Sequence, residues 1–122
     1  MNVLIVEDDA RTARTLGQML GEDGYNVELA FDGAAAIERL SRDPLPDVLV
    51  VDYMLPHVNG FAIASFARSR QSGLPIVIVS SYQEVVTWLR PRLGPPVVML
   101  PKPLVYADLT RELALVKHPT TA

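Results

Sequence analysis

The chain has no cysteine, few aromatic residues and no long hydrophobic run. Phe, Trp and Tyr make up 7% of its 122 residues. Without cysteine, neither a disulfide framework nor a thiolate metal site can form. The first apolar stretch, from Val3 to Val6, is followed at once by three acids, which fits neither a signal peptide nor a membrane-spanning helix. We therefore expect a cytoplasmic protein that does not contact the membrane.

The bulk composition favours one self-contained folded unit. A chain of this length forms a single domain, and 49% of its residues are hydrophobic, enough for one sizeable core. The net charge is −3, with acids and bases interspersed along the chain. This pattern argues against non-specific binding of nucleic acid or of a membrane surface.

Short apolar runs alternate with longer stretches of helical spacing, a pattern typical of stacked βαβ units. It predicts an α/β fold with a parallel sheet covered on both faces, the second strand lying at an edge. The expected strands are 2–6, 26–30, 48–51, 76–79 and 97–100. A helix from about Gln83 to Leu89 should be short and should end or kink near Pro91, because proline lacks the amide donor.

Polar residues follow four of these strands. They are Glu7-Asp8-Asp9, Asp52, Ser80 and Lys102-Pro103. Each alone could be an ordinary turn residue. Because the carboxyl ends of parallel strands meet at one edge, where open α/β sheets bind ligands, the four together predict one functional site.

Three carboxylates at one place repel each other, so either one stays protonated or a cation neutralises them. The available ligands are oxygens, and His57 and His118 fall in a loop and in the tail. This set favours Mg²⁺, or Mn²⁺, over zinc. Asp52, held at the end of a buried strand, is a candidate nucleophile toward phosphorus. Ser80 could donate a hydrogen bond to a phosphoryl oxygen, and Lys102 could neutralise another.

These residues, together with Asp52-Tyr53-Met54-Leu55-Pro56 and Gly60, resemble the receiver domain of a two-component response regulator along essentially the whole chain. The resemblance implies a five-stranded, doubly wound (βα)5 fold of the flavodoxin-like class over residues 1–118, with a short tail at 119–122. It also implies a signalling switch that accepts a phosphoryl group on Asp52. The donor would be a histidine kinase or a histidine phosphotransfer protein. Such a regulator assists its own phosphorylation and dephosphorylation and is not an enzyme with a separate substrate.

The resemblance also assigns roles within the site. Asp8 would bind magnesium directly and Glu7 through water, with Asp52 and the backbone carbonyl of Met54 as further ligands. Ser80 would be the switch hydroxyl and Lys102 the charge partner of the phosphate. The Lys102–Pro103 bond is expected to be cis. Asp9 directly precedes the first helix and suits a helix cap, although the three adjacent acids also allow a register one residue later.

One departure concerns the coupling of the site to a partner. Met99 stands where the family usually has Tyr or Phe, so the aromatic ring that usually couples to Ser80 is absent. The expected switch and partner surface is therefore Tyr82, Trp88, Met99 and Tyr106, on the face of the fourth helix, fifth strand and fifth helix. An unidentified output protein, or a second copy in a homodimer, could bind there. Partial core packing is the other interpretation of Trp88.

Two other functions compete with the switch. A receiver-like domain could dock partners without being phosphorylated, which the Met99 departure would favour. A magnesium-dependent phosphohydrolase would need an acid close after Asp52 to protonate the leaving group. Residues 53–56 contain none, which argues against this enzyme.

Overall fold

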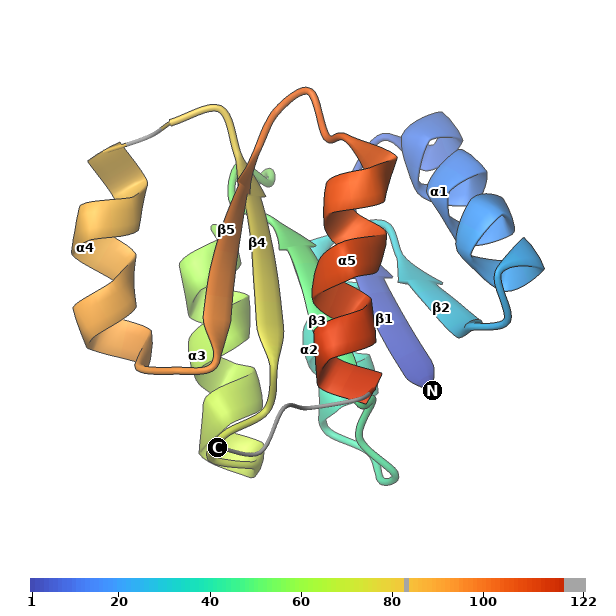
Figure 1. Cartoon of the computed structure of the whole chain (residues 1–122). Coiled ribbons are helices and arrows are strands. Elements are labelled where there is room, and N and C mark those ends of the chain that lie inside the picture. The colour runs from blue at the N-terminus through green and yellow to red at the C-terminus, as the bar shows by residue number, and fades with distance from the viewer. Residues whose placement is uncertain (83, 118–122) are drawn as a thin grey trace.

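Five strands alternate strictly with five helices (Figure 1). The computed structural model describes residues 1–82 and 84–117. The strands are β1 (Asn2–Val6), β2 (Asn26–Ala30), β3 (Val48–Asp52), β4 (Ile76–Ser80) and β5 (Val97–Pro101). The helices are α1 (Ala10–Glu22), α2 (Gly33–Leu40), α3 (Gly60–Arg70), α4 (Glu84–Leu93) and α5 (Tyr106–Lys117). All five strands lie where the sequence predicts them, the last three each one residue longer.

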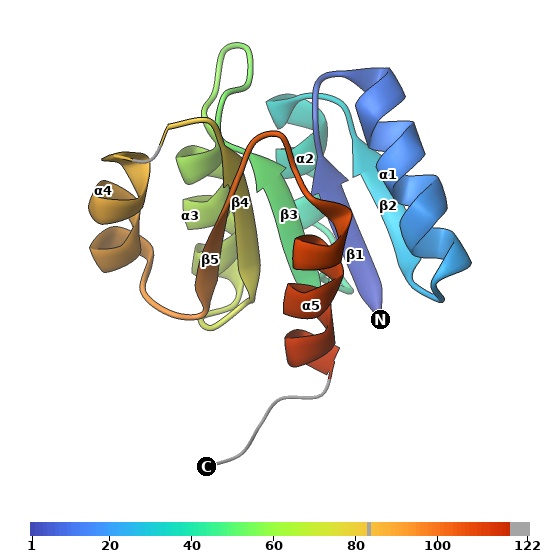
Figure 2. The same cartoon turned by 45° about the horizontal axis from the view of Figure 1, so that its top comes forward.

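The strands form one parallel sheet in the order β2-β1-β3-β4-β5, which confirms the doubly wound α/β fold. Strand β2 lies at an edge, as predicted. Helices α1 and α5 cover one face, and α2, α3 and α4 cover the other (Figures 1 and 2). The strand order reverses between β1 and β3, and the site lies at the carboxyl ends of these two strands.

The sheet separates two hydrophobic cores. Leu4, Leu49 and Ile78 belong to the core beneath α2, α3 and α4, whereas Ile5 and Val50 belong to the core beneath α1 and α5. This division follows from the two-residue period of a strand, which points successive side chains to opposite faces. The runs of Val, Leu and Ile in the central strands therefore supply both cores at once.

Helix α4 is short and ends within two residues of Pro91, as predicted. It runs to Leu93, four residues beyond the expected end at Leu89. The Arg68 guanidinium on α3 donates to carbonyls at and beyond the end of α4. The acceptors are Leu93 (2.6 Å), Gly94 (2.9 Å) and Pro96 (2.6 Å), together with Leu74 (2.7 Å). These carbonyls, which lack partners within the helix, are therefore satisfied from α3.

The cap of α1 and the Lys102–Pro103 bond agree with the sequence-based expectations. Asp9 caps α1, since its side chain accepts a hydrogen bond from the Thr12 amide at 3.2 Å. The Lys102–Pro103 bond is cis, as expected. No helix among the described residues is both long and apolar enough to cross a membrane.

Candidate functional site

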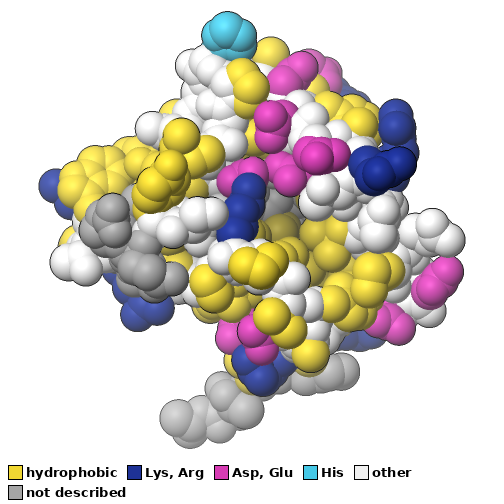
Figure 3. Space-filling view, turned by 90° about the horizontal axis from the view of Figure 1, so that it is seen from above, with side chains coloured by type: hydrophobic (Ala, Val, Ile, Leu, Met, Phe, Trp, Pro, Cys, Tyr) yellow, Lys and Arg dark blue, Asp and Glu magenta, His cyan; other side chains and the backbone are white. Residues whose placement is uncertain are grey.

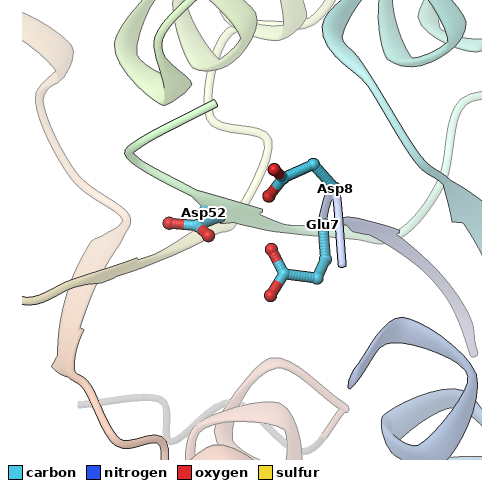
Figure 4. Close-up of side chains that lie close together, drawn as sticks. All are labelled: Glu7, Asp8 and Asp52. Atoms are coloured by element: carbon cyan, nitrogen blue, oxygen red, sulfur yellow. The ribbon is translucent and has the colours of Figure 1, made fainter. Parts of the chain in front are cut away.

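Three carboxylates meet at the carboxyl edge of the sheet. Figure 4 shows Glu7 and Asp8, just after β1, pointing toward Asp52 at the end of β3. One oxygen of each lies within 4.8 Å of the other two. Asp9 is turned away to cap α1, so the acidic pair beside Asp52 is Glu7 and Asp8 and not the next pair along the chain.

Asp52 is buried and held by two donors. Only 5% of the residue is exposed. Its Oδ2 accepts a hydrogen bond from Lys102 Nζ at 2.5 Å, and its Oδ1 accepts one from the Met54 amide at 3.2 Å. The carboxylate therefore has a fixed orientation, a cation on one oxygen and a backbone dipole on the other.

Gly60, one of the residues that carry the resemblance, packs directly against the backbone of Asp52 and Tyr53, a contact that the sequence did not reveal. Its amide donates to the Tyr53 carbonyl at 2.8 Å. A Cβ at Gly60 would lie 2.6 Å from the Asp52 carbonyl oxygen and 2.8 Å from Tyr53 Cα. The start of α3 can approach the end of β3 this closely only with glycine.

The charges at this edge are unbalanced. Burial, and then the adjacent Asp52 carboxylate, raise the pKa of Glu7 to about 7. Burial lowers the pKa of Lys102, but its hydrogen bond to Asp52 and the nearby carboxylates outweigh that effect and raise the pKa overall. In Figure 3 acidic side chains gather beside a basic one at this edge. One ammonium thus faces three carboxylates.

The residues present fit a hard divalent cation. Among the described residues Glu7 Oε2 is buried without a hydrogen-bond partner, and it lies in an all-oxygen cluster. Mg²⁺ and Mn²⁺ prefer such ligands. His57 lies in the exposed β3–α3 loop, outside this cluster. His118 lies outside the described residues.

Ser80 ends β4 and is also buried, with 4% exposed. Its Oγ accepts a hydrogen bond from the Tyr82 amide at 2.9 Å. The side chains of Tyr82 and Met54 point outward, 46% and 54% exposed. The Ser80 hydroxyl thus bonds to the segment that leads into α4.

The expected partner-surface residues Met99 and Tyr106 pack against different cores. Met99 is half-buried against the core beneath α2, α3 and α4, whereas Tyr106 packs against the core on the other face. The Tyr106 hydroxyl donates to Asp23 Oδ2 at 2.6 Å, which joins α5 to the end of α1. The shared surface of Tyr82, Trp88, Met99 and Tyr106 stays a prediction.

The family model for the response regulator receiver domain matches residues 3–113. The chain belongs to this family. The receiver domain is 39% identical over 85 residues to response regulator MprA of Mycobacterium leprae (strain TN). That match covers 70% of this chain and 37% of the relative, so the chain spans well under two thirds of the curated protein.

Solved receiver domains share the fold. The non-phosphorylated HemR receiver domain of Leptospira biflexa is 31% identical with a TM-score of 0.81, and the match covers 99% of this chain and 97% of that one. Response regulator protein TrrA of Thermotoga maritima, solved in complex with Mg(2+)-BeF, has a TM-score of 0.80 at 20% identity, covering 94% and 97%. At that identity the likeness shows the fold alone.

Proposed function

We propose that this receiver domain is a phosphorylation-activated switch of a two-component system or phosphorelay. It accepts a phosphoryl group on Asp52 from a phosphohistidine of a histidine kinase or a histidine phosphotransfer protein. One observation carries the proposal: the buried Asp52 carboxylate is bonded to Lys102 at 2.5 Å beside two further carboxylates. This arrangement suits phosphoryl transfer, in which the protein mainly positions groups and neutralises charge.

The transfer is a displacement at phosphorus. An Asp52 carboxylate oxygen forms the new O–P bond while the N–P bond of the phosphohistidine breaks. The electron pair of that bond stays on the imidazole nitrogen, which takes up a proton. Lys102 already contacts an Asp52 oxygen and would neutralise charge on the bound phosphoryl group. The Ser80 hydroxyl would donate a hydrogen bond to another phosphoryl oxygen.

A magnesium or manganese ion fits this proposal. The carboxylates of Glu7, Asp8 and Asp52 and the backbone carbonyl of Met54 would hold it. Bound there, the ion would neutralise charge on the carboxylates and on a phosphoryl oxygen. The unpartnered Glu7 Oε2 and the Mg(2+)-BeF complex of TrrA support the assignment.

The switch would act through the hydrogen bond between Ser80 and the Tyr82 amide. If the Ser80 hydroxyl turned toward a phosphoryl oxygen, the Tyr82 amide would lose its acceptor. The segment leading into α4 would then rearrange, and phosphorylation would shift the population toward a form that binds an output partner. The cytoplasm remains the expected location.

Intact-mass measurement tests the proposal. The chain is incubated with acetyl phosphate, with and without Mg²⁺, beside Asp52→Asn and Asp47→Asn variants. Asp47 is a matched control because it lies exposed just before the start of the strand that ends at Asp52, where it accepts a hydrogen bond from the Asn2 amide. We expect one phosphoryl group, dependent on Mg²⁺, on the wild type and on Asp47→Asn but not on Asp52→Asn. Absence of the gain in the wild type would favour a docking module that works without phosphorylation.

A further inference from the structure

The charge of the chain is divided between two parts, so the expectation of evenly interspersed charges is wrong. Residues 1–52 contain eleven acids and four bases. Residues 53–107, which form α3, β4, α4 and β5, contain five bases and one acid, Glu84. The second part therefore forms a basic region in an acidic protein.

Three of the five bases in this region are already engaged. Arg68 donates to four carbonyls, Arg70 bonds to Asp43 at 2.9 Å and Lys102 bonds to Asp52. Arg90 and Arg92 of α4 are exposed, and neither pairs with any acid whose side chain the structure describes. The positive charge open to a partner is thus concentrated on α4.

An aromatic pair adjoins this charge. The ring centroids of Phe61 on α3 and Trp88 on α4 lie 4.7 Å apart with an interplanar angle of 69°. The Arg92 guanidinium lies 4.3 Å from the Trp88 ring centroid and donates to the Trp88 carbonyl at 2.8 Å. Trp88, the one tryptophan of the chain, is 42% exposed. We name Phe61, Trp88 and Arg92 the α3–α4 patch.

The α3–α4 patch has the composition of a binding surface. Trp, Tyr and Arg are the residues that dominate binding energy at protein interfaces. Figure 3 shows hydrophobic side chains gathered beside the acidic edge. Tyr82 and Met54 are also exposed. Arg68 fixes the end of α4 against α3, so the patch is presented on a rigid support.

We infer that the α3–α4 patch docks an acidic protein segment carrying an apolar anchor. The anchor would pack on Trp88 and Phe61, and the carboxylates of the segment would pair with Arg92 and Arg90. Nucleic acid is disfavoured, because two exposed arginines are far fewer than the roughly six to ten phosphate contacts of a typical DNA-binding protein. This surface differs from the face of α4, β5 and α5. The inference goes beyond the phosphorylation of Asp52 and holds for the unphosphorylated chain.

Trp88 provides a direct readout. The probe is a short peptide of Asp and Glu with one Leu and one Phe a helical turn apart, so that Trp88 is the one tryptophan in the sample. We expect a saturable change in Trp88 emission and a weaker affinity at higher salt. The same peptide with Gln and Asn in place of Glu and Asp should bind at least about tenfold more weakly.

Variants assign the binding to the patch. Arg92→Glu should weaken the affinity about tenfold, and Arg92→Lys, which keeps the charge, should weaken it much less. Arg14→Glu is the matched control, because the Arg14 guanidinium lies 5.4 Å from the Phe31 ring centroid on another part of the surface. It should leave the affinity unchanged. Circular dichroism confirms that each variant is folded.

Three results would overturn the inference. They are no saturable change in Trp88 emission, equal binding of the neutral peptide, and equal loss of affinity in Arg14→Glu and Arg92→Glu. Sedimentation of the chain alone provides a further test. A dimer that Arg92→Glu dissociates, combined with no peptide binding, would show that a second copy occupies the patch.

Discussion

Strands β3 and β5 deliver the two side chains that bond to each other, yet their surroundings differ. All five residues of β3 are buried at the centre of the sheet, whereas only one residue of β5, at the edge, is buried. The Asp52 side chain is 6% exposed and the Lys102 side chain 35%. The acceptor is therefore fixed by the core, and its cationic partner is supplied by a more accessible edge. The candidate phosphoacceptor thus lies at the centre of the sheet, and the surfaces open to partners lie beside its β5 edge.

The largest expected effect comes from truncating core side chains on a central strand and on the edge strand β5. Ile78 of β4 is fully buried and pairs in register with the half-buried Met99 of β5. We expect Ile78→Ala to lower the free energy of unfolding by about 3–4 kcal/mol and Met99→Ala by about 1–2 kcal/mol. Urea denaturation measures both values. Equal losses would mean that β5 is as tightly packed as the centre.

The next largest effect is expected at Gly60, where the start of α3 closely approaches the backbone of Asp52. Gly60→Ala should lower the free energy of unfolding by about 1–3 kcal/mol, because its Cβ would meet backbone atoms that cannot swing away. It should also slow phosphorylation by acetyl phosphate by displacing Asp52. Gly21→Ala is the matched control. It lies in α1 with no atom near its Cβ position, so alanine there should stabilise the chain by about 0.5–1 kcal/mol. Similar effects at both glycines would contradict the role of Gly60.

The stabilisation of the chain by Mg²⁺ should depend on Asp8 and not on the adjacent Asp9. At about 100 times its dissociation constant, Mg²⁺ should raise the free energy of unfolding of the wild type by about 2.7 kcal/mol. Asp8→Asn should remove most of this gain, because Asp8 lies in the carboxylate cluster. Asp9→Asn should keep it, because asparagine still caps α1. Thermal melts with and without Mg²⁺ test this, and a larger loss in Asp9→Asn would mean that the register of the acids is wrong.

The smallest effect concerns the hydrogen bond that joins α5 to α1. Burial, then the hydrogen bond to Asp23 and the charge of Asp23, raise the pKa of Tyr106 from 10.0 to about 12. The folded state thus holds this proton more tightly than the unfolded state does. The resulting stability is complete below about pH 10 and is lost as the pH rises toward about 12. Urea denaturation across this pH range should show a smaller decline in the free energy of unfolding for Tyr106→Phe than for the wild type. For Tyr82→Phe the decline should equal that of the wild type.

The sequence predicted the sheet and much of the candidate site because both depend on local pattern. Runs of Val, Leu and Ile identified the strands, and a polar residue after a run identified its end. What it missed depends on contacts between distant residues. Arg68 of α3 satisfies the carbonyl of Leu93 at the end of α4, Gly60 matters because β3 passes within contact distance, and Tyr106 bonds to Asp23 because α5 packs on the same face of the sheet as α1. None of these contacts can be seen from the neighbours of each residue along the chain.

Chemical trapping of the phosphorylated chain tests the central claim most directly. Borohydride reduces an acyl phosphate to an alcohol, so a phosphorylated aspartate becomes homoserine, which peptide mass mapping can locate. After treatment with acetyl phosphate and Mg²⁺, we predict homoserine at position 52 alone. Reduction at Glu7 or Asp8 instead, or a bound phosphoryl group that borohydride leaves in place, would contradict Asp52 as the acceptor.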